Sequence, residues 1–114
     1  MTAAIVVILR VIGLIWAIGS VFIMRNARAA GDSDAARWVF VGGVLTFAAG
    51  LLLAAASRWA VLPAVLLAVQ QALFHWRQAK LMPPDAPRPN PAHVAIATMV
   101  ALAAAILAAK GALI

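Results

Sequence analysis

The strongest constraint on the fold of this chain is a series of four apolar segments, each long enough to cross a lipid bilayer as a helix. The segments cover residues 2–24, 38–56, 59–78 and 92–113. A spanning helix needs about 20 mostly apolar residues, with about 17 at the lower end. Because the bilayer core holds no water to bond the backbone, each segment must satisfy its own amide groups as a helix. The sequence therefore predicts an all-α fold, an integral membrane four-helix bundle in which residues 1–114 form a single transmembrane domain.

The composition agrees with this prediction and excludes a soluble fold. Hydrophobic residues make up 67% of the 114 and charged residues 11%, against about 45–50% and about 25% in soluble proteins. A short chain has too little interior to bury so much apolar surface in water, and the same numbers exclude intrinsic disorder. The chain has no cysteine, which excludes disulfides, Cys-bound zinc and thiol redox chemistry by this chain.

Short links with turn and cap residues separate the segments. After the first segment, Gly31 can adopt the left-handed conformation that ends many helices, and Asp32, Ser33 or Asp34 can cap the next helix. The dipeptide at 57–58, between the second and third segments, leaves room only for a tight reversal. Neighbouring helices are therefore expected to run antiparallel.

Prolines mark the link before the fourth segment. Five of the six prolines lie in residues 83–91, where they end the third helix and predict a stiff, extended connection. Asn90 and Pro91 are the residue types that favour the N-cap and the first position of a helix. Pro63 falls in the first turn of the third helix, where its missing N–H costs little.

Basic residues are distributed unevenly between the two ends of the predicted bundle. One end carries Arg25, Arg28, Arg37, Arg77, Lys80 and Arg88, and the other carries Arg58 and Lys110. Six against two places the links at 25–37 and 79–91 in the cytoplasm and both termini outside. This distribution accounts for the net charge of +6 without a basic patch interleaved with aromatics. Nucleic acid is therefore not expected as a partner.

Small residues recur at every fourth position of the segments, and such rows let membrane helices approach closely. The row of the second segment is the clearest and that of the first is weaker. The rows are Gly42, Thr46, Gly50 and Ala54; Gly13, Ala17 and Ser20; Ala60, Ala64, Ala68 and Ala72; and Ala97, Ala101, Ala105 and Ala109. Polar residues of the spans fall on or beside the same faces. We expect a compact bundle with a polar centre, from which Trp16 and Gln70 point away.

Arg10 is the most informative polar residue of the spans. It lies about 12 Å into the membrane if residue 2 marks the outer edge, and the spans contain no Asp or Glu to neutralise it. Its side chain can extend to the headgroups, or donate to Gln71, Thr46 or helix carbonyls inside the bundle. It can also bind an anionic or carbonyl-bearing ligand, such as a lipid headgroup or a quinone. The sequence leaves these three roles open.

The candidate ligand-binding residues are Arg10, Gln71, His75 and Thr46. Gln71 and His75 lie four residues apart on one helix face, and His93 begins the fourth segment near the same end. Two imidazoles can bind a metal or haem, but neither lies in a metal-ligand motif. Interfacial hydrogen bonding is therefore the favoured role, and neither a metal site nor a particular cofactor is predicted.

Part of the sequence resembles the DoxX-like membrane proteins. The resemblance covers residues 42–64. This segment has a pair of small residues, the run Gly50-Leu51-Leu52-Leu53, a short turn with Arg58 and the alanine-rich third helix. Arg10 followed by Gly13 is also similar to the first span of that family. The resemblance implies a four-helix inner-membrane protein, in some cases an accessory partner of membrane oxidoreductases.

These features favour an accessory or scaffold subunit as the function. Its expected partners are membrane lipids and other membrane subunits or copies of itself, with a lipid or quinone as candidate ligand. A small oligomeric transporter or channel is the alternative, with the polar centre as its path. An enzyme is less favoured because the spans lack paired carboxylates for acid–base work. The DoxX-like family often has a glutamate where this sequence has Thr46, so the resemblance transfers no catalytic residue.

The predicted orientation is testable by cysteine labelling in intact cells. Ser33→Cys and Asp85→Cys should resist an impermeant thiol reagent, whereas Ser57→Cys should react because its turn faces outward. The parent protein has no cysteine and is the unlabelled control. Labelling of the first two variants from outside would reverse the orientation and leave the number of spans unchanged.

Overall fold

The computed structural model describes residues 2–31, 33–81, 85 and 91–114, and every regular element within these ranges is helical. Along the chain these elements are α1 (Thr2–Ala29), α2 (Asp34–Ala54), the short 3-10 helix η1 (Arg58–Ala60), α3 (Val61–Leu81) and α4 (Ala92–Ala109). The helices α1, α2 and α4 and the continuous η1–α3 stretch are each long and apolar enough to cross a membrane. The all-α prediction is confirmed, and each predicted segment corresponds to one of these helices.

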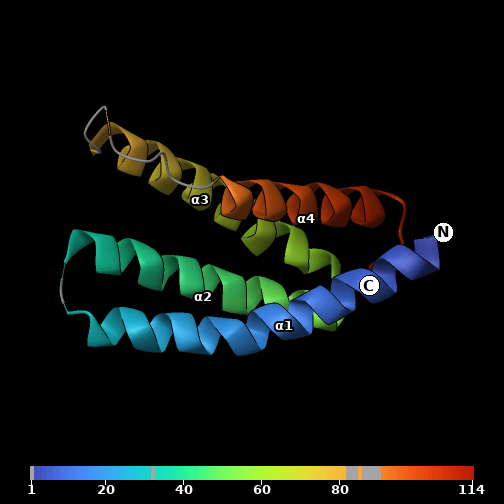
Figure 1. The fold of residues 1–114 in the computed structure, drawn as a ribbon. Helices are drawn as coiled ribbons and strands as arrows, with labels where there is room; N and C mark the ends of the chain where they lie inside the picture. Colours follow the sequence, from blue (N-terminus) through green and yellow to red (C-terminus); the bar gives the residue numbers. More distant parts are fainter. Residues whose placement is uncertain (1, 32, 82–84, 86–90) are drawn as a thin grey trace.

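The helices form two antiparallel pairs (Figure 1). Helix α1 packs chiefly on α2, and α3 packs chiefly on α4, while α1 and α4 touch only lightly. The pairs are joined where α2 turns into η1 and α3, and they draw apart toward the opposite end of the bundle. The two pairs therefore meet along only part of their length.

The contact between α1 and α2 depends on two glycines that face each other. A Cβ added at Gly13 would lie 2.6 Å from the Gly50 carbonyl oxygen and 2.6 Å from the Ala54 amide nitrogen. A Cβ added at Gly50 would lie 2.6 Å from the Gly13 carbonyl oxygen and 2.7 Å from the Ala17 amide nitrogen. The two backbones thus pack directly on each other, as small-residue rows allow. Gly13, Ala17 and Ser20 are all buried, so the row predicted to be weak lines the closest helix contact.

The link between α1 and α2 uses the predicted residues. Gly31 has a φ of 101°, the left-handed conformation that suits glycine. Ser33 is the N-cap of α2 among the three candidates, and its Oγ accepts a hydrogen bond from the Ala36 amide at 3.1 Å. Helix α1 continues to Ala29, past the predicted end of the span at residue 24.

The tight reversal predicted at 57–58 is present. Helix α2 ends at Ala54, two residues before the predicted end of the span at 56. Ala56 takes the left-handed conformation, with a φ of 55°. The Ser57 Oγ then caps η1 by accepting a hydrogen bond from the Trp59 amide at 3.2 Å.

The fourth helix ends earlier than the predicted span. Helix α4 stops at Ala109, and Gly111, with a φ of 71°, turns the last residues out of the helix. The Ile114 amide donates to the Ala56 carbonyl at 2.8 Å, and the Arg58 amide donates to the Ile114 carbonyl at 2.8 Å. The last residues therefore pair with the α2–α3 turn and do not continue the helix to residue 113.

The predicted alanine rows of α3 and α4 are only partly correct. The buried small and apolar residues are Ala60, Pro63, Ala64 and Leu67 in the third helical stretch and Ala97, Val100, Ala101, Ala104 and Leu107 in α4. Ala72 and Ala109, the last members of their rows, are exposed. A strict spacing of four drifts by about 40° per step around a helix with 3.6 residues per turn. The contact face of α4 therefore follows alternating steps of three and four.

The prediction that Trp16 and Gln70 point away from the bundle is wrong. Gln70 is only 7% exposed, and its Nε2 donates to the Trp38 carbonyl oxygen at 2.8 Å. Trp16 is half-buried and packs against both groups of core residues. Gln70 is inside because the bond to α2 gives its amide a partner, which a buried polar group requires.

The start of α4 also differs from the prediction. The helix begins at Ala92, and Pro91 is the N-cap without a side-chain hydrogen bond. Asn90, the predicted cap, and the prolines between 83 and 89 lie outside the described residues.

A pair of glycine substitutions tests the α1–α2 contact. Gly50→Ala should destabilise the protein, because its methyl group would meet the backbone of Gly13 and Ala17, and over-packing costs about 1–3 kcal/mol. Gly19→Ala is the matched control, since nothing lies within 4 Å of its added Cβ and alanine favours a helix by about 1 kcal/mol. Thermal unfolding in detergent should give a lower midpoint for Gly50→Ala and an equal or higher one for Gly19→Ala. Equal midpoints for the two variants would contradict the close contact.

Candidate functional site

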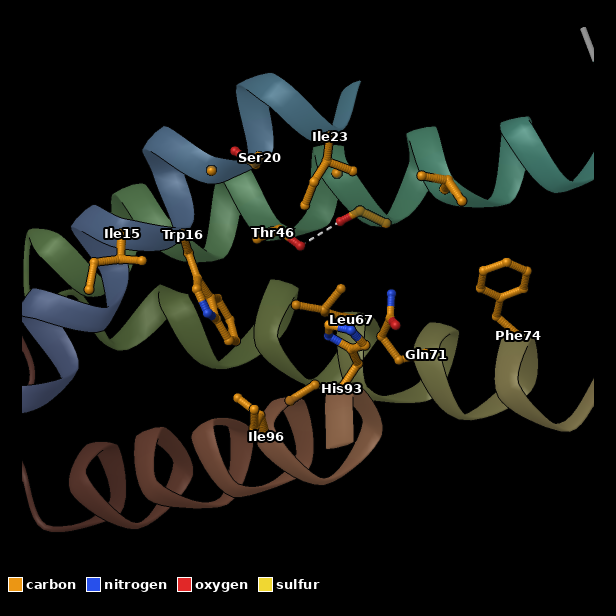
Figure 2. Close-up of a pocket in the computed structure, with 15 residues that line it drawn as sticks. Ile15, Trp16, Ser20, Ile23, Thr46, Leu67, Gln71, Phe74, His93 and Ile96 are labelled. Carbon is orange, nitrogen blue, oxygen red and sulfur yellow. Dashed lines mark hydrogen bonds between the residues drawn. The ribbon is translucent and has the colours of Figure 1, made fainter. Parts of the chain in front are cut away.

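A cavity of about 500 Å³ lies among the four helices. It is lined by Ile15, Trp16, Gly19, Ser20 and Ile23 of α1, Val39, Gly42, Gly43 and Thr46 of α2, Leu67, Gln71 and Phe74 of α3, and His93, Ile96 and Ala97 of α4. Figure 2 shows side chains from both helix pairs converging on this space. Small-molecule sites typically have volumes of about 300–1,000 Å³ and apolar walls with a few polar groups. The cavity has both properties.

Two hydroxyl groups in the cavity wall are bonded to their own helices. The Ser20 Oγ donates to the Ala17 carbonyl at 2.9 Å, and the Thr46 Oγ1 donates to the Gly42 carbonyl at 2.7 Å (Figure 2). This backbone bonding uses the single proton of each hydroxyl. The oxygen of Thr46, which is partly exposed, can therefore only accept from a ligand, whereas Ser20 is fully buried.

An amide pair on α3 lies beside the cavity, and its Gln71 member lines the wall. The Gln71 Nε2 donates to the Gln70 Oε1 at 2.9 Å, and Gln70 in turn donates to α2. Gly42 makes room for the pair, since a Cβ there would lie 3.1 Å from both the Gln70 Oε1 and the Gln71 Nε2. Packing thus orients the Gln71 amide beside the cavity.

The two histidines do not share this site. His93, exposed at the start of α4, lines the cavity, whereas half-buried His75 does not. Within the described residues there is no group of three or more His, Cys, Asp or Glu side chains that could hold a metal ion.

An aromatic and ionic cluster joins α2 to α3 at one side of the cavity. The Trp38 and Phe74 rings stack at 5.9 Å between centroids with 13° between planes. The Arg77 guanidinium lies 5.7 Å from the Trp38 ring centroid and pairs with the Asp34 carboxylate. Because both members of the ion pair are well exposed, the stacking and the buried Gln70 bond contribute more to this contact than the ion pair does.

Arg10 lies outside the cavity. Its side chain is exposed, and its Nε donates to the Ala54 carbonyl at the end of α2 at 2.9 Å. The partner is a helix carbonyl, as in the donor role expected for Arg10, but the side chain is exposed and does not lie inside the bundle. A cation is also favourable at this position, because the C-terminal end of a helix carries partial negative charge.

The structure therefore brings together two of the four candidate ligand-binding residues. Gln71 and Thr46 line the cavity, and Arg10 and His75 do not. Sequence reasoning missed Trp16 and Phe74 as wall residues. The spacing contains a signal for Trp16, since it lies three residues after Gly13 and so within about 60° of that glycine on the helix.

Comparison with protein-family models, with curated proteins and with solved structures finds no match for this chain.

Arg10 variants test whether this residue supports the α1–α2 pair or a ligand. Arg10→Leu should lower the thermal midpoint, because the end of α2 loses a charged donor. Arg10→Lys should restore only part of the midpoint, since an ammonium lacks the planar fork of the guanidinium. Neither variant should change ligand binding in the cavity. Lost binding with an unchanged midpoint would contradict this assignment.

Proposed function

We propose that this chain is a small polytopic protein of a bacterial inner membrane, acting as an accessory or scaffold subunit that holds a lipid or quinone between its helices. The observation that carries the proposal is the cavity, which has an apolar wall, a size suited to one small ligand and a few uncharged polar groups.

The outer surface of the bundle supports a membrane location. Large apolar side chains of α1 are widely exposed, with Ile8 at 56%, Leu14 at 56%, Ile18 at 64% and Phe22 at 60%. An apolar surface of this extent is unfavourable in water and matches a bilayer interior. The four helices also have the length that a bilayer requires.

Two indole–cation pairs support the proposed placement in the bilayer. Arg58 lies 5.9 Å from the Trp59 ring centroid, and Lys80 lies 4.1 Å from that of Trp76. The two tryptophans stand at opposite ends of the third helical stretch and are 65% and 58% exposed. At 1.5 Å per residue they are about 26 Å apart, close to the hydrocarbon thickness of about 30 Å. Amphipathic indoles favour both membrane interfaces.

The DoxX-like resemblance fits this proposal, because it implies a four-helix architecture and a membrane oxidoreductase as partner. A four-helix protein that assists a membrane oxidoreductase needs surfaces for contact and no catalytic acid of its own. In the proposed orientation, the basic links at 25–37 and 79–91 face the cytoplasm and the chain termini face outward.

The alternative function, a small oligomeric transporter, needs a polar path across the membrane. Thr46, Gln71 and His93 line the cavity, but Arg10 faces away from it at the end of α2. Among the residues that the structure describes, these polar side chains therefore form a local pocket without a continuous path to Arg10, which supports a bound ligand more than a transported one.

Native extraction tests the proposed function. The protein should be extracted together with its surrounding lipid into polymer-bounded discs, and its mass and companions determined by native mass spectrometry. A defined complex with another membrane protein, retaining a lipid or quinone, is the expected result. A homo-oligomer that moves solutes in liposomes would overturn the proposal in favour of a transporter.

A further inference from the structure

The hydrogen-bonding groups of the cavity wall include two accepting oxygens, those of Thr46 and Gln71, beside the remaining Gln71 N–H and the His93 imidazole. The Thr46 hydroxyl proton is bonded to the Gly42 carbonyl, so its oxygen can only accept from a ligand. Gln71 uses one amide proton on Gln70, which leaves its carbonyl oxygen and one N–H without a partner among the described residues. A ligand that satisfies Thr46 and Gln71 must therefore donate a hydrogen bond.

The wall lacks the guanidinium and ammonium groups that most often bind phosphate, and its one basic side chain is the His93 imidazole, exposed at the start of α4. No Arg, Lys, Asp or Glu lines the cavity within the part of the chain that the structure describes. Arg10 donates to the end of α2, and Arg77 pairs with Asp34. A phosphate or carboxylate head would thus enter a mostly apolar space without a guanidinium or ammonium to match it, which is costly.

We infer that the cavity selects a neutral lipid whose head carries a free hydroxyl group, and this inference rests on the proposed function. A hydroxyl both donates and accepts, so it can donate to the Thr46 or Gln71 oxygen and accept the remaining Gln71 N–H. A ketone or ether head accepts only, so it can take the remaining Gln71 N–H but makes no hydrogen bond to the Thr46 or Gln71 oxygen. Among quinone-type ligands, the reduced hydroquinone form meets the same requirement.

The remaining wall suits the apolar part of such a ligand. Ile15, Leu67 and Ile96 come from three different helices and face the same space as the Trp16 ring (Figure 2). Trp16 is the one tryptophan of the four that lines the cavity. Its fluorescence is therefore a local probe of occupancy.

Quenching of Trp16 by bromine-tipped undecyl probes tests the inference. Three probes share one chain and differ in the head: an alcohol, its methyl ether, and the carboxylate of matched length. The signal of the cavity is the difference in quenching between the parent protein and Trp16→Phe, measured in the same detergent. The alcohol should quench saturably and bind at least about fivefold more tightly than the ether or carboxylate, a difference of about 1 kcal/mol.

Two threonines that make the same backbone bond provide matched variants. Thr98 Oγ1 donates to the Val94 carbonyl at 2.8 Å but does not line the cavity. Thr46→Val keeps the side-chain shape and removes the acceptor, so it should weaken alcohol binding about fivefold and leave ether binding unchanged. Thr98→Val should bind all three probes like the parent. Gln71→Leu should likewise remove the preference for the alcohol.

The outcomes separate this inference from the proposed function. Saturable quenching with equal affinity for the three heads, or an alcohol preference that Thr46→Val and Gln71→Leu leave intact, would overturn the inference and leave a ligand-holding subunit standing. Tighter binding of the carboxylate would overturn it in favour of an anionic ligand. No saturable quenching by any probe would overturn both the inference and the ligand-binding part of the proposed function.

Discussion

The direct backbone contact between Gly13 and Gly50 is the constraint on which the rest of the structure depends. Without side chains at these two positions, α1 and α2 approach until a Cβ on either would lie 2.6 Å from the backbone of the other helix. Dispersion and close packing drive such contacts between apolar helices. The same approach brings the end of α2 within reach of Arg10, whose bond to the Ala54 carbonyl adds to the pairing.

The second pair of helices meets the first mainly through α2. Near the α2–α3 turn the contact is made by small residues such as Ala49 and Ala64, both 0% exposed. Toward the other end it is made by large and polar groups, including the Trp38–Phe74 stack and the Gln70 bond. Because larger side chains hold the helices further apart, the pairs diverge there, and the cavity occupies the space between them (Figures 1 and 2).

Residues whose role depends on neighbouring backbone atoms were predicted better than residues whose role depends on distant parts of the chain. Gly31 and Ser33 occupy the left-handed helix end and the N-cap that their residue types predict, since both roles depend on neighbouring backbone atoms. The position of Gln70 was predicted wrongly, because its place inside depends on a carbonyl of α2 that is distant in sequence. Of the predicted site, Gln71 and Thr46 line the cavity, but Phe74 and His93 join them only through the packing of α3 and α4.

The sequence by itself determined that four helices form, where their links fall and which faces of α1 and α2 meet. A long apolar segment must bond its own backbone, and a glycine row permits only one kind of close approach. The tertiary structure alone decided how α3 and α4 rotate about their axes, since alanine covers much of both helices and offers several faces of nearly equal size. It also decided the partner of Arg10 and the early end of α4, because the Ala54 carbonyl and the Ala56 backbone that bond these groups belong to distant parts of the chain.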